Sequence, residues 1–158
     1  MRRNRLALAV AGSALALSGA MGTHAAAADV EGVAVLATET YQNRATNRCM
    51  DDSNFGLRPV GCHFGTTQQW TVTTNGSYRQ LKSVGTGRCL DDSDLGFRTV
   101  GCHSGTTQQW TVIQLGGGYI QFKNRGTGRC ADDSSGAGLR TWTCWAATDS
   151  KVVNQSWF

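Results

Sequence analysis

Apolar and polar residues alternate in short runs along most of the chain, and no long stretch repeats its apolar positions with the period of a helix. In the run from Trp70 to Val72, alternate side chains fall on one face of a strand, so the tryptophan is expected to fill a core. Hairpin signals separate such runs, at Asn75-Gly76 and at Gly116-Gly117-Gly118. This pattern predicts an all-β fold.

The strand pattern is repeated. Residues 48–72 read RCMDDSNFGLRPVGCHFGTTQQWTV and residues 88–112 read RCLDDSDLGFRTVGCHSGTTQQWTV, with 19 of 25 positions identical at an offset of forty residues. A more divergent third copy begins at Arg129 with RCADDSSGAGLRTWTC and ends in QSWF. A period near forty also fits a propeller blade, but three copies are too few to close a propeller. Three such units around a pseudo-threefold axis predict a β-trefoil, with repeats over about 41–75, 76–116 and 117–158.

The first 28 residues differ from the rest. Three arginines (Arg2, Arg3 and Arg5) precede an apolar stretch, residues 6–21, which is followed by four alanines at 25–28, a pattern typical of a secretory signal. The apolar stretch is too short, and too rich in Gly and Ser, to be a comfortable membrane span. We therefore expect a signal peptide at 1–28, a tether at 29–40, and a secreted, extracellular protein without membrane insertion.

The charge balance argues against nucleic acid as a partner. The chain has 15 Lys and Arg against 11 Asp and Glu, but three of the arginines lie in the leader and all the acids follow it, leaving twelve against eleven. The mature chain thus lacks the basic footprint of a nucleic-acid-binding protein.

All six cysteines lie beyond the leader, and an even number in an exported chain favours disulfides over metal or catalytic thiols. Fifteen pairings are formally possible. Pairing within each repeat respects the internal symmetry and predicts Cys49–Cys62, Cys89–Cys102 and Cys130–Cys144. By the chain-entropy model each bond contributes about 3 kcal/mol.

Each repeat also ends in a Gln-x-Trp signature, at residues 68–70, 108–110 and 155–157. With three such signatures, each downstream of a Cys-x-Asp and a second Cys, the chain resembles the ricin B-type lectins, also known as R-type lectins or family 13 carbohydrate-binding modules. The resemblance covers roughly residues 41–158. It implies a β-trefoil with up to three shallow sugar sites, one per repeat. The signature tryptophans are expected in the core: Trp70, Trp110 and Trp157.

The third repeat matches the family's sugar-site pattern throughout. In that pattern an Asp lies two residues after the first Cys, an aromatic residue two before the second Cys, and an Asn just before the Gln of the signature. The resemblance therefore implies a sugar site made by Asp132, Trp142, Asn154 and Gln155. If Cys130 lies opposite Cys144, Asp132 lies opposite Trp142 on the same face of a hairpin.

The first two repeats depart from that pattern. They keep Asp51 with Gln68 and Asp91 with Gln108, but valine replaces the aromatic residue and threonine replaces the asparagine. These sites are expected to be weak or vestigial. The replacing residues are Val60, Val100, Thr67 and Thr107.

Two features of the pattern have open interpretations. Each repeat carries an arginine four residues before its second Cys (Arg58, Arg98 and Arg140), and strand arithmetic puts the first two diagonal to Asp51 and Asp91. An Asp–Arg pair would hold the hairpin together and occupy the carboxylate. The segment 145–154 of the third repeat is longer than its counterparts, and either walls the pocket, contacts a second sugar unit, or is a tolerated surface insertion.

The sequence indicates a carbohydrate-binding module rather than an enzyme. The two histidines outside the leader, His63 and His103, occupy one repeat-equivalent position, and no Ser-His-Asp arrangement is evident. Neither a cofactor nor a metal is expected, and the oligomeric state is left open. The expected ligand is a galactose-type sugar or a polysaccharide such as xylan. The alternative is a protein-binding β-trefoil, a protease inhibitor or toxin-like factor with vestigial sugar sites.

Overall fold

The computed structural model describes residues 36–158. The expected signal peptide and residues 29–35 of the expected tether lie outside this range. The first repeat contains β1 (Leu36–Glu39), β2 (Arg48–Ser53), β3 (Gly56–Gly61), η1 (Thr66–Gln68) and β4 (Trp70–Asn75). The second contains β5 (Tyr78–Ser83), β6 (Cys89–Ser93), β7 (Gly96–Val100), η2 (Thr106–Gln108) and β8 (Trp110–Gly116). The third contains β9 (Tyr119–Asn124), β10 (Cys130–Ser134), β11 (Gly138–Trp142) and η3 (Ser150–Gln155).

The segment expected to be a tether is partly folded. Its last described residues form β1, which pairs antiparallel with β4 from Leu36 opposite Thr73 to Glu39 opposite Trp70. Four residues are too few to show an alternation, and this strand exists because the edge of β4 offers it backbone hydrogen bonds. The fold therefore begins before position 41.

A ring of strands forms the body of the trefoil. Its hydrogen-bonded order is β1, β4, β5, β8 and β9. The ring closes through Trp157, which bridges to Ile120 of β9 and to Asn43. Beside this closure, Gln42 and Phe158 exchange two backbone hydrogen bonds of 2.9 and 3.1 Å. The first and third repeats thus meet at the two ends of the described chain.

The predicted hairpin turns are present. Asn75 pairs with Tyr78, so that Gly76 and Ser77 form a two-residue loop between β4 and β5. Gly76 has a φ of 56°, a left-handed conformation that favours glycine. The second glycine signal connects β8 and β9 and is accompanied by a bulge between Gln114 and Gly116.

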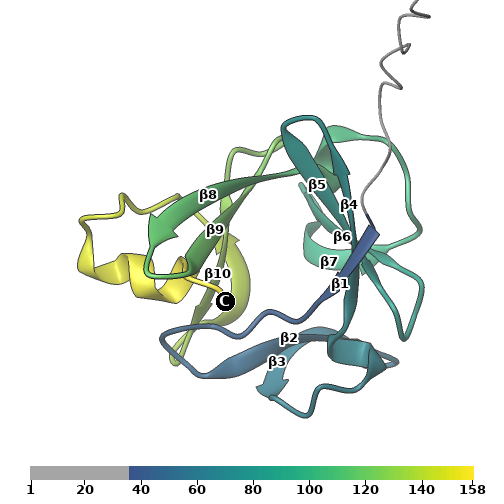
Figure 1. Ribbon diagram of the computed structural model, residues 1–158, viewed down its shortest axis with the longest axis horizontal. Coiled ribbons are helices and arrows are strands. Elements are labelled where there is room, and N and C mark those ends of the chain that lie inside the picture. Colours follow the sequence, from purple (N-terminus) through teal and green to yellow (C-terminus); the bar gives the residue numbers. More distant parts are fainter. Residues whose placement is uncertain (1–35) are drawn as a thin grey trace, which may run out of the picture. The chain divides into compact units, whose positions relative to one another are not determined.

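Three further hairpins, β2–β3, β6–β7 and β10–β11, carry the Cys-x-Asp-Asp-Ser segments, and their second strands contact one another. In Figure 1 they lie in different sectors of the molecule, in blue, teal and yellow-green. The three predicted disulfides are confirmed: Cys49–Cys62, Cys89–Cys102 and Cys130–Cys144, each with 5.0 Å between Cα atoms.

The signature tryptophans Trp70, Trp110 and Trp157 are fully buried in one hydrophobic core with residues such as Leu81 and Phe122. Each indole nitrogen donates to a backbone carbonyl of its own repeat's Cys-x-Asp strand, at 3.3, 3.1 and 3.2 Å respectively. The indole therefore supplies apolar area while its one polar group stays satisfied. None of the helices in residues 36–158 is long and apolar enough to cross a membrane.

Candidate functional site

The β10–β11 hairpin brings together the acid and the aromatic residue of the third repeat, in a different register from the predicted one. Asp132 lies opposite Arg140, and Trp142 lies opposite Cys130. The prediction that Asp132 faces Trp142 directly is therefore wrong. It treated the disulfide partners as an opposed pair, whereas Cys144 follows the end of β11 and its bond runs diagonally. Asp132 and Trp142 remain on one face as diagonal neighbours.

Arg140 lies between these two residues. Its Nε is 3.2 Å from Asp132 Oδ1, and its guanidinium carbon is 4.4 Å from the centre of the Trp142 ring. The other two arginines also lie directly opposite their acids, rather than diagonally as predicted, with Nε–Oδ1 distances of 3.7 Å for Arg58–Asp51 and 3.9 Å for Arg98–Asp91. The arginine thus pairs with the acid in every repeat, and most closely in the third.

The Asp132 carboxylate is almost completely buried, and its Oδ2 has no hydrogen-bond partner among the residues that the structure describes. Burial raises the pKa of this carboxyl above its ordinary value of 3.8. The hydrogen bond and charge of Arg140 and the amide of Gln155 lower the pKa, and the charge of Asp133 adds to the rise. A buried acceptor without a donor costs free energy, and a ligand hydroxyl would supply that donor.

In the equivalent acids of the first two repeats the Oδ2 atom has neighbours that Asp132 Oδ2 lacks, whereas Asp51 Oδ1, like Asp132 Oδ2, has no hydrogen-bond partner among the described residues. Asp51 Oδ2 accepts a hydrogen bond of 2.7 Å from the Thr67 hydroxyl and lies 3.3 Å from His63 Nε2. Asp91 Oδ2 has the same two kinds of neighbour, a threonine hydroxyl at 2.8 Å and a histidine Nε2 at 3.5 Å. In the third repeat Asn154 and Trp145 stand at these two positions. The substitutions therefore free the Oδ2 of the third-repeat acid from a threonine and a histidine, while the unpartnered oxygen of Asp51 is its Oδ1.

Only the third repeat has an aromatic side chain two residues before its second cysteine, although the first repeat exposes Phe55 beside Arg58. The Trp142 side chain is an exposed large hydrophobic group, with 45% of its surface accessible. Val60 and Val100 stand at the equivalent register positions, opposite the first cysteine of each hairpin. A valine offers no flat face for the C–H side of a sugar ring.

The glutamines of the signature are fully buried and hold the loop that follows the second cysteine. Gln155 Oε1 accepts from the Trp145 backbone N–H at 2.9 Å and its Nε2 donates to the Thr143 carbonyl at 2.9 Å. Gln68 and Gln108 make the same two kinds of bond in their repeats. These amides position the wall of the site through backbone contacts.

Asn154 lies half-buried at the end of the long segment, and its backbone carbonyl accepts a hydrogen bond of 2.8 Å from the Asn43 side chain. The segment is built by η3, whose N-cap Asp149 accepts from the Lys151 N–H at 2.8 Å. Lys151 Nζ lies 4.8 Å from the centre of the Trp145 ring. The long segment is therefore folded around a short helix beside the signature, coloured yellow in Figure 1.

The second aspartate of each hairpin, on the opposite face, makes contacts that the sequence analysis missed. Asp133 binds Arg48 of the first repeat at 2.6 Å and also accepts a hydrogen bond from Thr46. The same pairing links each repeat to the next, as Asp52–Arg88 and Asp92–Arg129. The repeated Thr-x-Arg-Cys motif was the available signal, because each copy of it supplies both partners.

The site has the chemistry of sugar recognition. An acceptor oxygen, a guanidinium and an aromatic face are the groups that bind hydroxyls and the C–H side of a sugar. No group of three His, Cys, Asp or Glu residues within 36–158 is arranged to hold a metal ion. The fold and the site define a carbohydrate-binding class of protein.

Comparison with known families agrees with this class. Residues 66–145, half of the chain, match the model of the ricin-type beta-trefoil lectin domain-like family. The chain therefore belongs to this family. No curated protein matches the chain.

Solved structures show the same fold. The chain is similar to the designed 3-fold symmetric protein ThreeFoil, with a TM-score of 0.66 and 20% identity over 76% of this chain and 95% of that one. It is similar to the hemolytic lectin CEL-III, with a TM-score of 0.64 and 21% identity over 80% of this chain and 30% of that one. It is also similar to an exo-beta-1,3-galactanase from Clostridium thermocellum, with a TM-score of 0.64 and 21% identity over 76% of this chain and 29% of that one. The chain spans less than a third of the last two proteins, and at these identities the likeness is one of fold.

Proposed function

We propose that this protein is a secreted carbohydrate-binding module whose main sugar site is the β10–β11 hairpin of the third repeat. The observation that carries the proposal is the unpartnered, buried Oδ2 of Asp132 beside the exposed ring of Trp142. A sugar hydroxyl would donate to that oxygen, and the C–H side of the ring would stack on the indole. Asn154 and Gln155 border the same site from the loop that ends in the signature.

Arg140 controls access to this site. In the structure it stacks on Trp142 and pairs with Asp132 at once. A neutral sugar therefore has to displace the guanidinium from the indole, so the net free energy that the sugar gains by stacking there is small. With a few hydrogen bonds, each worth about 1 kcal/mol, a single sugar binds at a Kd on the order of 1 mM.

The expected ligand is a neutral, galactose-type sugar or a unit of a polysaccharide such as xylan. A fold that is shared with proteins named as a lectin and a galactanase supports this class, without identifying the sugar. A repeated ligand would raise the apparent affinity if more than one site engaged it. Secretion is proposed from the N-terminal pattern and the disulfides.

The test is calorimetric and NMR titration with the monosaccharides galactose and xylose. Trp142→Ala should abolish binding of the monosaccharide, because it removes the stacking face. Val60→Ala, the matched change in the first repeat, should leave binding unchanged. Undiminished binding by the Trp142 variant would overturn the proposed site, and inhibition of a protease by a protein that binds no glycan would favour the protein-binding alternative.

A further inference from the structure

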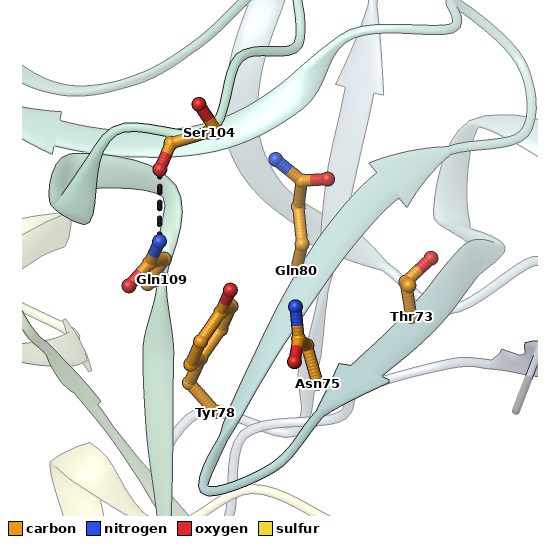
Figure 2. A pocket seen from close by; sticks show the side chains of 6 residues that line it. All are labelled: Thr73, Asn75, Tyr78, Gln80, Ser104 and Gln109. Atoms are coloured by element: carbon orange, nitrogen blue, oxygen red, sulfur yellow. Dashed lines mark hydrogen bonds between the residues drawn. The ribbon is translucent and has the colours of Figure 1, made fainter. Parts of the chain in front are cut away.

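A hollow lies between the first and second repeats, and none of its lining residues belongs to the third-repeat site. It has a volume of about 170 Å³ and is lined by six neutral side chains that carry hydroxyl or amide groups: Thr73, Asn75, Tyr78, Gln80, Ser104 and Gln109. Figure 2 shows the four hairpin side chains on one side of the hollow and Ser104 and Gln109 on the other. Such groups suit a ligand with many hydroxyls and no charge.

The hollow continues along the outer face of the β4–β5 hairpin. Thr73 pairs with Gln80 and Asn75 with Tyr78, and the next pair on this face is Thr71 with Lys82. A neighbouring hollow of about 600 Å³ is lined by this last pair and shares Thr73 and Gln80 with the first. Three cross-strand pairs, each two residues apart, extend about 13 Å along the strands. We call these three pairs the β4–β5 track.

Two amide side chains that line the first hollow, one of them in the track, are held in place by neighbouring residues. Gln80 Nε2 donates to the His103 carbonyl at 2.8 Å and to Gln108 Oε1 at 3.1 Å, so its own oxygen is left to accept from a ligand. Gln109 Nε2 donates to the Ser104 carbonyl at 2.8 Å (Figure 2). Fixed polar groups bind with little further loss of side-chain entropy.

Arg125 of the third repeat fixes the aromatic residue of the track. It donates to Gln109 Oε1 at 2.6 Å, and its guanidinium carbon lies 4.8 Å from the centre of the Tyr78 ring. The half-buried Tyr78 ring is therefore held between repeats as part of the lining of the hollow.

The junction of the second and third repeats keeps the hydrogen bonds of Gln80, made there by Gln121, but has lost other features of the track. Ile113 and Ala146 stand where the first junction has Thr73 and Ser104. Tyr119, the counterpart of Tyr78, also lies beside an arginine, but it is in addition covered by Phe158 at 5.6 Å between ring centres. Repetition of the fold therefore does not account for the open polar track.

We propose that the β4–β5 track binds an extended, neutral saccharide chain, with one ring against Tyr78 and the next over Thr71 and Lys82. The first hollow is smaller than the roughly 300–1,000 Å³ of pockets that enclose a drug-sized ligand, so it holds one ring of a chain. The track shares no residue with the third-repeat site. Two separate sites on one chain give a polysaccharide the avidity that one millimolar site lacks.

The test is an NMR titration of the full chain with xylohexaose and with galactotetraose. Each oligosaccharide is added up to a concentration on the order of 10 mM. In the Trp142→Ala variant, which lacks the third-repeat site, the side-chain amides of Asn75, Gln80 and Gln109 should still shift. Tyr78→Ala should remove these shifts and leave those around Trp142. Thr73→Ile, which installs the residue of the second junction, should weaken binding at the track about tenfold without affecting the fold, since a β-branched residue suits an outer strand position.

The two sites can fail independently. If both oligosaccharides leave the amides of the track unshifted in the Trp142→Ala variant, the β4–β5 track is not a saccharide site, whatever happens at the third repeat. Shifts that persist in Tyr78→Ala would equally overturn it. If the unmodified protein shows no shifts around Trp142 while the amides of the track still shift, the result would count against the proposed function of the third repeat and support the track.

Discussion

The Asp133 carboxylate binds Arg48, which lies 85 residues earlier in the chain, and so joins the third repeat to the first. With Asp52–Arg88 and Asp92–Arg129 it completes a ring of three pairs. Each aspartate of the other two pairs accepts one further hydrogen bond from a threonine hydroxyl of the following repeat. Thr99 donates to Asp52 at 2.7 Å, and Thr141 donates to Asp92 at 2.8 Å. In the first repeat Pro59 stands at that position and cannot donate.

This difference predicts that two equivalent arginine variants lose different amounts of stability. Arg48→Ala should lower the free energy of unfolding by about 3 kcal/mol, because it leaves a fully buried carboxylate without its charged partner. Arg88→Ala should cost less, since Thr99 still donates to Asp52. Urea unfolding of the two variants measures both values, and an equal or larger loss for Arg88→Ala would contradict the order.

Arg140 is expected to compete with neutral sugars and to favour acidic ones. Arg140→Gln should strengthen galactose binding severalfold, because the cation–π contact worth about 1 kcal/mol no longer has to be displaced. The same change should weaken binding of galacturonic acid. Arg98→Gln, in a repeat with a valine in place of the aromatic ring, is the matched control and should alter neither affinity. Weaker galactose binding by Arg140→Gln would show that the guanidinium assists the neutral sugar.

The buried Asp132 carboxyl predicts a dependence on pH. Its pKa lies above 3.8 in the folded protein, so the folded state holds the proton more tightly than the unfolded chain does. The contribution of this group to stability therefore falls as the pH rises from 3.8 through the raised pKa. Sugar binding should change in the opposite direction, being weaker below the raised pKa because the protonated Oδ2 accepts less well.

Carboxyl carbon NMR would follow the titration of Asp132 directly, and Asp132→Asn should remove the pH dependence of sugar binding in this range. A titration midpoint below 3.8 would contradict the assigned effect of burial. An Asn variant that keeps the same pH dependence would place its origin elsewhere.

The signature glutamine is expected to act on stability in the second repeat. Gln108→Ala removes a fully buried amide that accepts from the His103 N–H at 2.8 Å and donates to the Gly101 carbonyl at 3.0 Å. The loss should be about 2–3 kcal/mol, measured by thermal or urea unfolding. Monosaccharide binding at Trp142 should be unchanged in the folded variant; a selective loss of binding would assign Gln108 a role in recognition.

The repeats, the trefoil and the disulfides were predictable because internal symmetry restricts the pairing of strands and cysteines. The hairpin register was not, because the sequence does not show that Cys144 lies beyond the end of its strand. Strand β1 was missed because its formation depends on β4, which lies more than thirty residues later. The ring of Asp–Arg pairs joins residues far apart in the sequence, and its one local signal was the repeated Thr-x-Arg-Cys motif.

The site was predictable in its residue types and only partly in its arrangement. The resemblance supplied Asp132 and Trp142, and strand arithmetic placed them on one hairpin face, where they lie as diagonal rather than opposed residues. The resemblance itself concerned residue types only. It gave no role to Arg140, whose position depends on a stacking contact, and none to His63, whose approach to Asp51 distinguishes the first repeat from the third. Contacts between side chains of adjacent strands require the register before they can be inferred.

Trp157 has a consequence for the order of folding. It supplies both bridges that join the ends of the strand ring, so the core cannot be completed until all three repeats have been synthesised. Contacts that span most of the chain make the search for the native state slow. The ring of strands can therefore close only after the last residues of the third repeat have joined the first.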